Sequence, residues 1–415
     1  MTTVHRLRLT VDDQIAQRYL PVPFDVPAGT ASLEVRLAYD TSAGVIDLGC
    51  EGPDGWRGWS GGARSRYVIT PDAATPGYLP GPLEPGEWHV VLGLHQLPGP
   101  VLDVVVEVDV PATGEVEIEP VAAVEQGPPR GCTRDLPAPD GLHWFAGDFH
   151  AHTRHSDGSE SIDQLAARGV AAGLDFIAVT DHNTTSHHAH LPGVGGRHAI
   201  TLLPGQEVTT ARGHANAFGD IGWIDFRRPA SEWVREVDAR GGVLSVNHAV
   251  DGDCAWQHPL TTLPRALELW HISWFRDLTS TFPWAFWQRW GGDAVVPIGG
   301  SDFHKPGGGW TLGTPTTWVA AVQNTPEVIL AGLAEGHTAI SVGVRPDATP
   351  DPLHTPLLLR LADELLAIAA DGAVLVDIEG RRRRISGPSV SVPAAWGTGP
   401  FHLEDADRRV LAICA

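Results

Sequence analysis

From about position 142 to position 343, short apolar runs typical of strands alternate with runs typical of helices. The strand-like runs lie at 142–150, 174–180, 199–207, 214–220, 243–247, 266–270, 294–300 and 338–343. The helical runs lie at 159–172, 231–242, 283–292 and 326–336. This alternation is typical of a parallel sheet with helical crossovers that closes into an α/β barrel. We therefore expect such a barrel over 142–350.

The two ends of the chain follow a different pattern. Residues 1–115 contain short β-rich runs between Gly and Pro turns, which predicts an all-β, sandwich-like domain. Residues 116–141 are rich in Pro and Gly and indicate a linker. Residues 351–415 predict a β-rich extension, in which the basic run 381–384 is expected to be a solvated turn.

Composition narrows the class of protein. The chain has 415 residues, of which 42% are hydrophobic and 19% charged, as expected of a folded globular protein with two domains or one barrel with an appendage. The formal net charge is −21, which argues against nucleic acid or an anionic membrane as a partner. An anionic substrate would need a local positive site, which divalent cations can supply.

Cysteine usage and targeting signals add little. The four cysteines are scattered and form no CxxC pair, so neither a disulfide framework nor a cysteine zinc site is indicated. The polar N-terminal segment lacks the apolar core of a signal peptide, and no apolar run is long enough to span a membrane. We expect a cytoplasmic protein. The sequence is also compatible with a homo-oligomer.

Histidines and carboxylates recur at the ends of the expected strands. In the stretch GDFHAHTRHSDG, His150 and His152 share one face of an extended chain and can hold one ion. A lone HxH is weak evidence, and a second one at 188–190 lies in a polar loop with His187, where we expect surface residues. The other members of the series are Asp157, Asp181, His182, Glu207, His214, His248, Asp302 and His304. Their convergence on the C-terminal edge, where α/β barrels build active sites, predicts a metal centre.

The composition of the set indicates its chemistry. Imidazole and carboxylate ligands suit Zn²⁺, Mn²⁺ or Fe²⁺. The ligands are too many for one ion, so a bridging carboxylate such as Glu207 is expected to hold two. Water between such ions can ionise near neutral pH, and the ions neutralise charge on the substrate. The residues thus predict metal-assisted hydrolysis.

At this point the motifs resemble a known family. DFHAHTRHSDG, VTDHN, PGQEV followed by GH, NHA, and GGSDFH occur in order over about 145–345. Together they resemble the PHP (polymerase and histidinol phosphatase) superfamily, and the strand-rich front looks closest to its carbaryl-hydrolase-like branch. The resemblance implies a distorted seven-stranded (β/α) barrel that holds two or three divalent ions.

The resemblance also implies ligand sets. One ion would take His150, His152, Glu207 and Asp302; a second would share Glu207 and add His214 and His248; a third would take Asp157, His182 and His304. Some members carry a histidine in place of Asp157. Asp302, Glu207 and His304 would be catalytic, with Asp302 as both ligand and proton shuttle. Asp181 would either orient a histidine ligand or cap a helix.

Residues next to the ligands are candidates for substrate binding. Basic groups that can hold an anion, or equally be solvated loop residues, are Arg154, His155, Arg212, His271 and Lys305. Trp270 or Trp274 can wall an apolar pocket, whereas Trp287 and Trp290 fall on a helical spacing typical of core. An aromatic wall favours an aryl or bulky ester.

Three functions remain open from the sequence. The first is a metal-dependent phosphoesterase that acts on a phosphomonoester or diester of a small molecule, with a metal-bridging hydroxide as nucleophile. The second is hydrolysis of an uncharged carboxyl ester, amide or aryl carbamate. The third is a non-catalytic metal-binding module. For the N-terminal domain we expect a structural or oligomerising role.

Overall fold

The computed structural model describes residues 1–124, 126–271, 274, 282–290, 292–307, 311–343 and 353–414. The chain divides into two compact units. Unit 1 combines residues 1–120 with two loops, 153–161 and 181–189, and unit 2 contains 121–152, 162–180 and 190–415. Both loops belong to the expected barrel region in sequence, yet they associate with the N-terminal domain, which no sequence pattern indicated.

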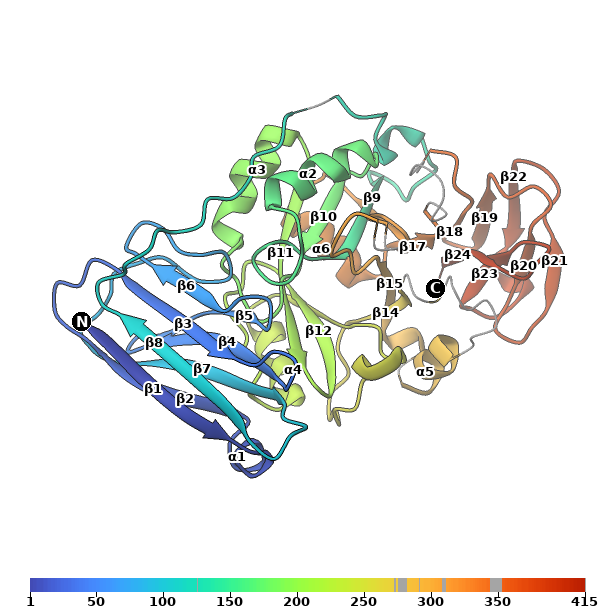
Figure 1. The fold of residues 1–415 in the computed structure, drawn as a ribbon. Coiled ribbons are helices and arrows are strands. Elements are labelled where there is room, and N and C mark those ends of the chain that lie inside the picture. The colour runs from blue at the N-terminus through green and yellow to red at the C-terminus, as the bar shows by residue number, and fades with distance from the viewer. Residues whose placement is uncertain are drawn as a thin grey trace. The chain divides into compact units, whose positions relative to one another are not determined.

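Unit 1 is built on two four-stranded antiparallel sheets, in the orders β1-β8-β3-β6 and β2-β7-β4-β5 (Figure 1). Their strands are β1 (Thr2–Leu9), β2 (Tyr19–Val26), β3 (Leu33–Tyr39), β4 (Val45–Gly52), β5 (Gly55–Gly61), β6 (Arg66–Ile69), β7 (Gly86–Gln96) and β8 (Leu102–Asp109). Apolar side chains from both sheets, such as Val35 and Val90, form one buried core. This is the packing that the alternating β-rich runs predict.

The large sheet of unit 2 contains seven strands that carry the candidate site. They are β9 (His143–Ala151), β10 (Phe176–Val179), β11 (Thr201–Thr210), β12 (Gly213–Phe218), β13 (Val243–Val246), β14 (Ala266–His271) and β15 (Val296–Gly300). They are hydrogen-bonded in this order, and after β15 an isolated parallel bridge joins Phe303 to Ala151 at the end of β9. The segment that follows β15 therefore returns to the first strand of the series.

The expectation of an all-parallel series is wrong at β12, which pairs antiparallel with both β11 and β13. Only residues 211 and 212 separate β11 from β12. A connection this short allows a hairpin, whereas a parallel crossover needs a dozen or more residues. The outcome is a mixed α/β sheet in which β9–β11 and β13–β15 keep parallel pairing.

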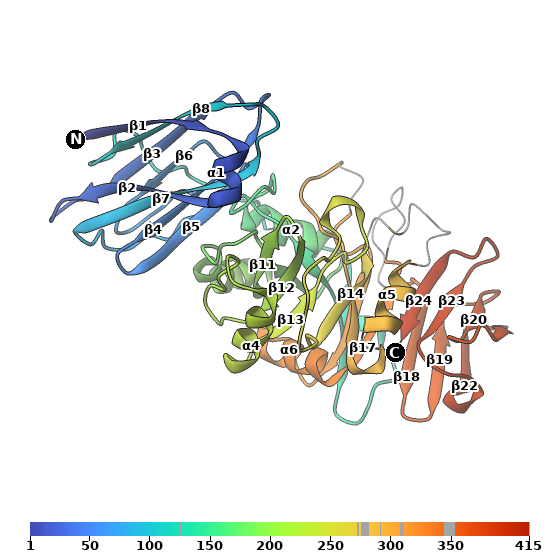
Figure 2. The same cartoon turned by 90° about the horizontal axis from the view of Figure 1, so that it is seen from below.

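In the described residues, α-helices follow β9, β10, β12 and β14 of the seven-strand series, and another follows the later strand at 316–321 (Figure 2). They are α2 (Ile162–Ala171), α3 (Leu191–His198), α4 (Ala230–Ala239), α5 (Phe282–Trp290) and α6 (Pro326–Glu335). Helix α6 has Pro326 in its first turn and ends at Gly336 in a left-handed conformation, as its sequence predicts. Helix α3 was not predicted; Leu191 and Val194 bury its apolar face in spite of the surrounding Gly and Pro.

The same sheet continues through β16 (Thr316–Ala321), which was not predicted, and β17 (Thr338–Ser341) into β24 (Val410–Cys414), β23 (Phe401–Glu404), β20 (Val374–Val376) and β21 (Arg382–Arg384). A separate sheet contains β18 (Leu357–Leu361), β19 (Glu364–Ile368) and β22 (Ser389–Pro393). The basic run is thus an exposed edge strand, not a turn. Charged side chains on such an edge oppose pairing with other chains. No helix in the described parts of the chain is long and apolar enough to cross a membrane.

Candidate metal centre

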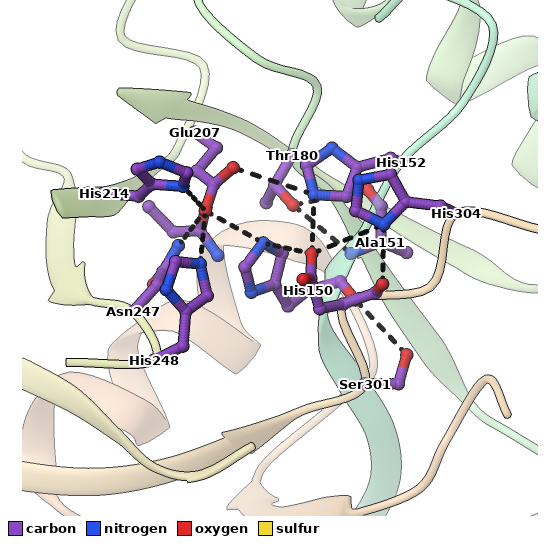
Figure 3. A network of polar contacts seen from close by, with 12 residues as sticks. His150, Ala151, His152, Thr180, Glu207, His214, Asn247, His248, Ser301 and His304 are labelled. Atoms are coloured by element: carbon purple, nitrogen blue, oxygen red, sulfur yellow. Dashed lines mark hydrogen bonds and ion pairs between the residues drawn. The ribbon is translucent and has the colours of Figure 1, made fainter. Parts of the chain in front are cut away.

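The predicted ligands of unit 2 lie together at one end of the strands of the large sheet (Figure 3). His150 lies near the end of β9, His152 follows that strand, and His248 and Asp302 each follow a strand by two residues. Glu207 lies within β11, which continues for three residues beyond it. His214 is the second residue of β12, and it reaches the same end because β12 runs antiparallel to β11.

The Glu207 carboxylate lies at the centre of this group and is fully buried. Its Oε1 is 3.1 Å from His150 Nε2, 3.3 Å from His214 Nδ1 and 3.2 Å from His248 Nε2. Asn247 Nδ2 donates a 2.9 Å hydrogen bond to the same oxygen. One carboxylate thus faces three imidazoles from three different strands or strand ends, as a bridging ligand would.

Asp302 approaches the same ring nitrogen of His150 as Glu207 does. Its Oδ1 is 3.2 Å from His150 Nε2 and 3.0 Å from His152 Nε2. His304 stacks on His152 with ring centroids 4.1 Å apart, and its Nδ1 lies 2.8 Å from the Asp302 backbone oxygen. His150, His152, Glu207 and Asp302 therefore lie together, as predicted for one ion.

His271, predicted only as a substrate contact, also lies at Asp302. Its Nε2 is 3.4 Å from Asp302 Oδ2, and its Nδ1 is 3.3 Å from Asp251 Oδ2. Burial disfavours the charged imidazole, but the two carboxylates outweigh that effect and raise the pKa of His271 to about 9. This placement makes His271 a partner of the predicted proton shuttle.

The electrostatics of the site follow from burial and opposite charge. Burial opposes ionisation of His150, but Asp302, Glu207 and Glu268 outweigh it and raise the pKa of His150 well above its ordinary value. Burial likewise opposes ionisation of Asp302, and the neighbouring histidines lower the pKa of that carboxyl well below its ordinary value. The buried carboxylates thus attract positive charge, which protons or metal ions can provide.

A second buried carboxylate, Glu268 on β14, was missed from the sequence. It is 1% exposed, its Oε1 lies 3.0 Å from His150 Nδ1, and its Oε2 accepts a 2.7 Å hydrogen bond from the His248 backbone N–H. A ring nitrogen held by a carboxylate fixes the orientation of a ligating histidine. The signal was present, since a glutamate inside the apolar run ALELW needs a buried partner.

The backbone is shaped around these groups. His248 and Asp302 have φ values of 26° and 51°. L residues adopt such positive φ values only at an energetic cost, and residues strained in this way cluster at functional sites. Gly300 lacks a side chain where a Cβ would lie 2.3 Å from Glu268 Oε1 and 2.5 Å from His150 Cβ. A glycine at this position thus allows β15 to pass close to Glu268 and His150.

The donor set fits divalent metal ions. His150, His152 and Glu207 each offer a ligand atom, and these atoms lie within 4.8 Å of one another. His150 Nε2 is buried and makes no hydrogen bond to the described residues, although two carboxylate oxygens lie 3.1 and 3.2 Å from it. A ring nitrogen that lies between two carboxylates suits a cation that all three groups share. Nitrogen and oxygen donors of this kind suit Zn²⁺, Mn²⁺ or Fe²⁺.

The remaining predicted ligands, Asp157 and His182, belong to unit 1, where His182 Nε2 lies 3.5 Å from Asp157 Oδ1. Asp181 accepts hydrogen bonds from Thr153 and Ser156 and so ties the two loops together. The roles predicted for Asp181 stay predictions. The third ligand set stays a prediction. His187, expected at the surface, is fully buried, with Nδ1 3.4 Å from Asp181.

The other candidate substrate contacts have protein partners or are exposed. Arg154 pairs with Glu117, and Arg212 donates to the Gln257 carbonyl. His155 is 3% exposed and its Nδ1 lies 2.7 Å from Ser186 Oγ, which gives it a structural contact. The rest of the set comprises exposed Lys305, buried Trp270 and half-buried Trp274. A role for these residues in substrate binding stays a prediction.

An aromatic cavity of about 500 Å³ adjoins the second-ion side of the centre. Trp256, Phe286 and Trp290 line it, and Ala249, the residue after His248, contributes to its wall. The Trp256 backbone lies against Gly213, the residue before His214. The described lining of this cavity includes neither Trp270 nor Trp274, and Trp290, expected in the core, is half-buried and lines the cavity.

Comparisons with known proteins add likenesses of fold. No family model matches the chain, and no curated protein matches it. A two-domain protein from Bacteroides vulgatus, with a predicted PHP-like metal-dependent phosphoesterase, is 15% identical; the match covers 70% of this chain and 91% of that one, with a TM-score of 0.38. A candidate metal-dependent phosphoesterase from Bifidobacterium adolescentis is 18% identical over 40% and 90% of the two chains, with a TM-score of 0.32.

An amidohydrolase from Chromobacterium violaceum, with bound sulfate and no metal, is 16% identical over 48% of this chain and 97% of that one, with a TM-score of 0.31. All three TM-scores lie below 0.5. The assignment of function therefore rests on the residues of this chain.

Proposed function

We propose that this chain is a divalent-metal-dependent hydrolase of the PHP type that acts as a phosphoesterase on a small molecule. The observation that supports it most is the Glu207 carboxylate, which faces His150, His214 and His248 at 3.1–3.3 Å. The seven strands β9–β15, with the bridge from Phe303 to Ala151, are consistent with the distorted seven-stranded barrel of the resemblance.

The residues of the site have distinct roles in this proposal. His150, His152, Glu207 and Asp302 would hold one ion, and Glu207 would share a second with His214 and His248. When bound, such ions supply Lewis acidity, which activates water near neutral pH and neutralises an anionic ester. Glu268 and Asn247 hold the ligands in orientation through hydrogen bonds to His150 and Glu207.

Asp302 and His271 would take part in proton transfer. Asp302 Oδ2 lies 3.4 Å from His271 Nε2, and Asp251 holds the other nitrogen of that ring. Asp302 can accept the proton of the attacking water, and His271 stabilises the charge of Asp302 between steps. His304, whose ring stacks on His152, would complete the catalytic set with Glu207.

The aromatic cavity favours a second candidate, the hydrolysis of an uncharged aryl ester, amide or carbamate. Its lining by Trp256, Phe286 and Trp290 suits a flat apolar group, and among the described lining residues only Arg289 is charged. The same cavity also fits the aryl group of a phosphate ester. The two candidate functions therefore differ in which bond of the substrate is hydrolysed, not in the group that the cavity holds.

A panel with one common aryl group separates the candidates. Protein loaded with Mn²⁺, Zn²⁺ or Fe²⁺ is assayed on naphthyl phosphate, a naphthyl phosphodiester, naphthyl acetate and naphthyl methylcarbamate. We expect turnover of the phosphate esters. Turnover of only the acetate or carbamate would establish the second candidate instead.

Variants test whether the centre is responsible for any turnover. His150→Ala and Glu207→Gln should each lower kcat/KM more than about a thousandfold, because several kcal/mol of charge stabilisation are lost. Glu232→Gln, on α4, where Glu232 pairs with exposed Arg228, is the matched control and should leave turnover unchanged. A protein that binds divalent ions but hydrolyses none of these substrates would favour the third function, a non-catalytic metal-binding module.

A further inference from the structure

We propose that the N-terminal sandwich positions a metal-ion site within unit 1: the turn at Gly77 and the side chain of Arg64 hold the two loops that carry Asp157 and His182. This inference rests on the proposed function, because it gives those two residues a metal-holding role. It goes beyond that function in making the first 120 residues necessary for the site.

A single residue of the sandwich, Gly77, contacts both loops through its backbone. The Gly77 N–H donates to Ser186 Oγ at 3.1 Å and lies 3.4 Å from His155 Nδ1. The Gly77 carbonyl accepts a 2.8 Å hydrogen bond from Thr184 Oγ1. His155 belongs to the loop of Asp157, and Thr184 and Ser186 belong to the loop of His182. The same turn therefore holds both loops.

Only glycine fits at this turn. Gly77 has a φ of +100°, and an added Cβ would lie 2.8 Å from the carbonyl oxygens of both His155 and Trp59. These are backbone atoms, so they cannot rotate away as a flexible side chain would. A side chain here would push the loop of Asp157 away from the sandwich, or distort β5 at Trp59.

Arg64 holds the loop of Asp157 at a second point. Its side chain is 14% exposed, and its Nη1 donates a 3.2 Å hydrogen bond to the carbonyl of Ser156, the residue before Asp157. Its positive charge also acts on Asp181, the residue before His182. A mostly buried guanidinium thus faces the neighbours of both candidate ligands.

Asp181 then joins the two loops to each other. Its carboxylate accepts hydrogen bonds from the backbone and hydroxyl of Thr153, at 2.8 and 2.7 Å, and from Ser156 Oγ at 2.6 Å. Asp157 and His182 each follow a residue anchored in this way. Their ligand atoms are 3.5 Å apart, close to the separation of about 3.4 Å that two 2.1 Å bonds make at a tetrahedral ion.

The experiment measures how many Mn²⁺ ions the full-length protein binds, and how tightly, by equilibrium dialysis with elemental analysis. Gly77→Ala and Arg64→Ala are compared with matched controls in the same sandwich. Gly55→Ala places a side chain at φ +120° in open space, and Arg66→Ala removes an arginine that pairs with Glu34. Thr184→Val, which removes one hydrogen bond to Gly77 with little change in shape, serves if Gly77→Ala does not fold.

We expect both test variants to bind one ion about 10- to 100-fold more weakly than the wild type, and both controls to bind all ions normally. Combined with Asp157→Ala and His182→Ala, which remove the same ion, Gly77→Ala should cause no further loss. Folded Gly77→Ala or Thr184→Val with every ion at wild-type affinity would overturn the inference.

Two other outcomes separate this inference from the proposed function. If Asp157→Ala with His182→Ala leaves metal binding unchanged, the inference fails while the centre at Glu207 stands. If the wild type binds no divalent ion at all, the proposed function fails, and the inference fails with it. Weaker binding in the controls as well would mean that the sandwich acts only through general stability, which also overturns the inference.

Discussion

At the scale of single residues, the two buried carboxylates of the metal centre differ in what they contact. Glu207 directs its oxygens at the ring nitrogens that would face an ion, whereas Glu268 holds His150 by the opposite nitrogen and His248 by its backbone. The first is placed to bind, and the second to orient. Replacing each one should therefore affect the protein differently.

Glu268→Gln tests the orienting role. Loss of the charge leaves His150 Nδ1 without its carboxylate partner, so we expect metal affinity and kcat/KM to fall about 10- to 100-fold, with the fold retained. Calorimetric titration with Mn²⁺ and steady-state kinetics measure the two effects. Exposed Glu364→Gln on β19 is the control. Unchanged affinity in Glu268→Gln would show that His150 needs no support from β14.

At the scale of elements, the sheet β1-β8-β3-β6 depends on a buried carboxylate. Glu34 on β3 is 2% exposed, and it accepts from Arg66 Nε at 2.6 Å and from the Gly114 N–H at 2.8 Å. Burial raises the pKa of Glu34, but Arg66 and the hydrogen bonds around it outweigh that effect and hold the pKa well below its ordinary value. The ionised form therefore stabilises this sheet.

The lowered pKa of Glu34 predicts how acid affects the stability of unit 1. The contribution of Glu34 is fully present above its unfolded pKa near 4.5 and is lost as the pH falls from there toward its folded pKa. Glu34→Gln should lower the free energy of unfolding by about 2 kcal/mol at pH 7, with the deficit shrinking below pH 4. Denaturant unfolding at both pH values measures it. Glu107→Gln removes a more exposed carboxylate that pairs with Arg36, and it should change the free energy of unfolding little. A deficit independent of pH would contradict the prediction.

At the scale of the whole molecule, the two units have separate apolar cores. The core of unit 1 includes Val35 and Val90, and one core of unit 2 includes Phe149 and Phe218. Cores of this kind can unfold in separate steps. Seven of the nine predicted ligands lie in unit 2, so metal binding should stabilise that unit most.

Scanning calorimetry tests this expectation. We expect two transitions, with Mn²⁺ at a hundred times its Kd raising the transition of unit 2 by about 5–10 °C, since ligand binding adds about 2.7 kcal/mol. Glu207→Gln should abolish that shift. A single transition that moves as a whole would instead show that the two units unfold cooperatively.

Much of the site was predictable because its residues follow local patterns. Strand-like runs that end at His150 or Glu207, or shortly before Asp302, place those groups at one end of the sheet once the strands lie parallel. Glu268 and Asn247 escaped prediction because their partners lie 118 and 40 residues away in sequence. Such contacts arise from strand order, which periodicity does not encode.

The sequence by itself determined the types of most elements, the β-rich ends and the ligand series, because propensity and spacing act over a few residues. The tertiary structure alone decided that β12 runs antiparallel and brings His214 to the ligand end of the sheet, and that Trp256 lines the aromatic cavity. It alone placed the loops of Asp157 and His182 with the sandwich, through contacts such as that of Gly77 with Ser186, 109 residues apart. Contacts over that distance depend on how whole elements pack, and no local pattern carries that information.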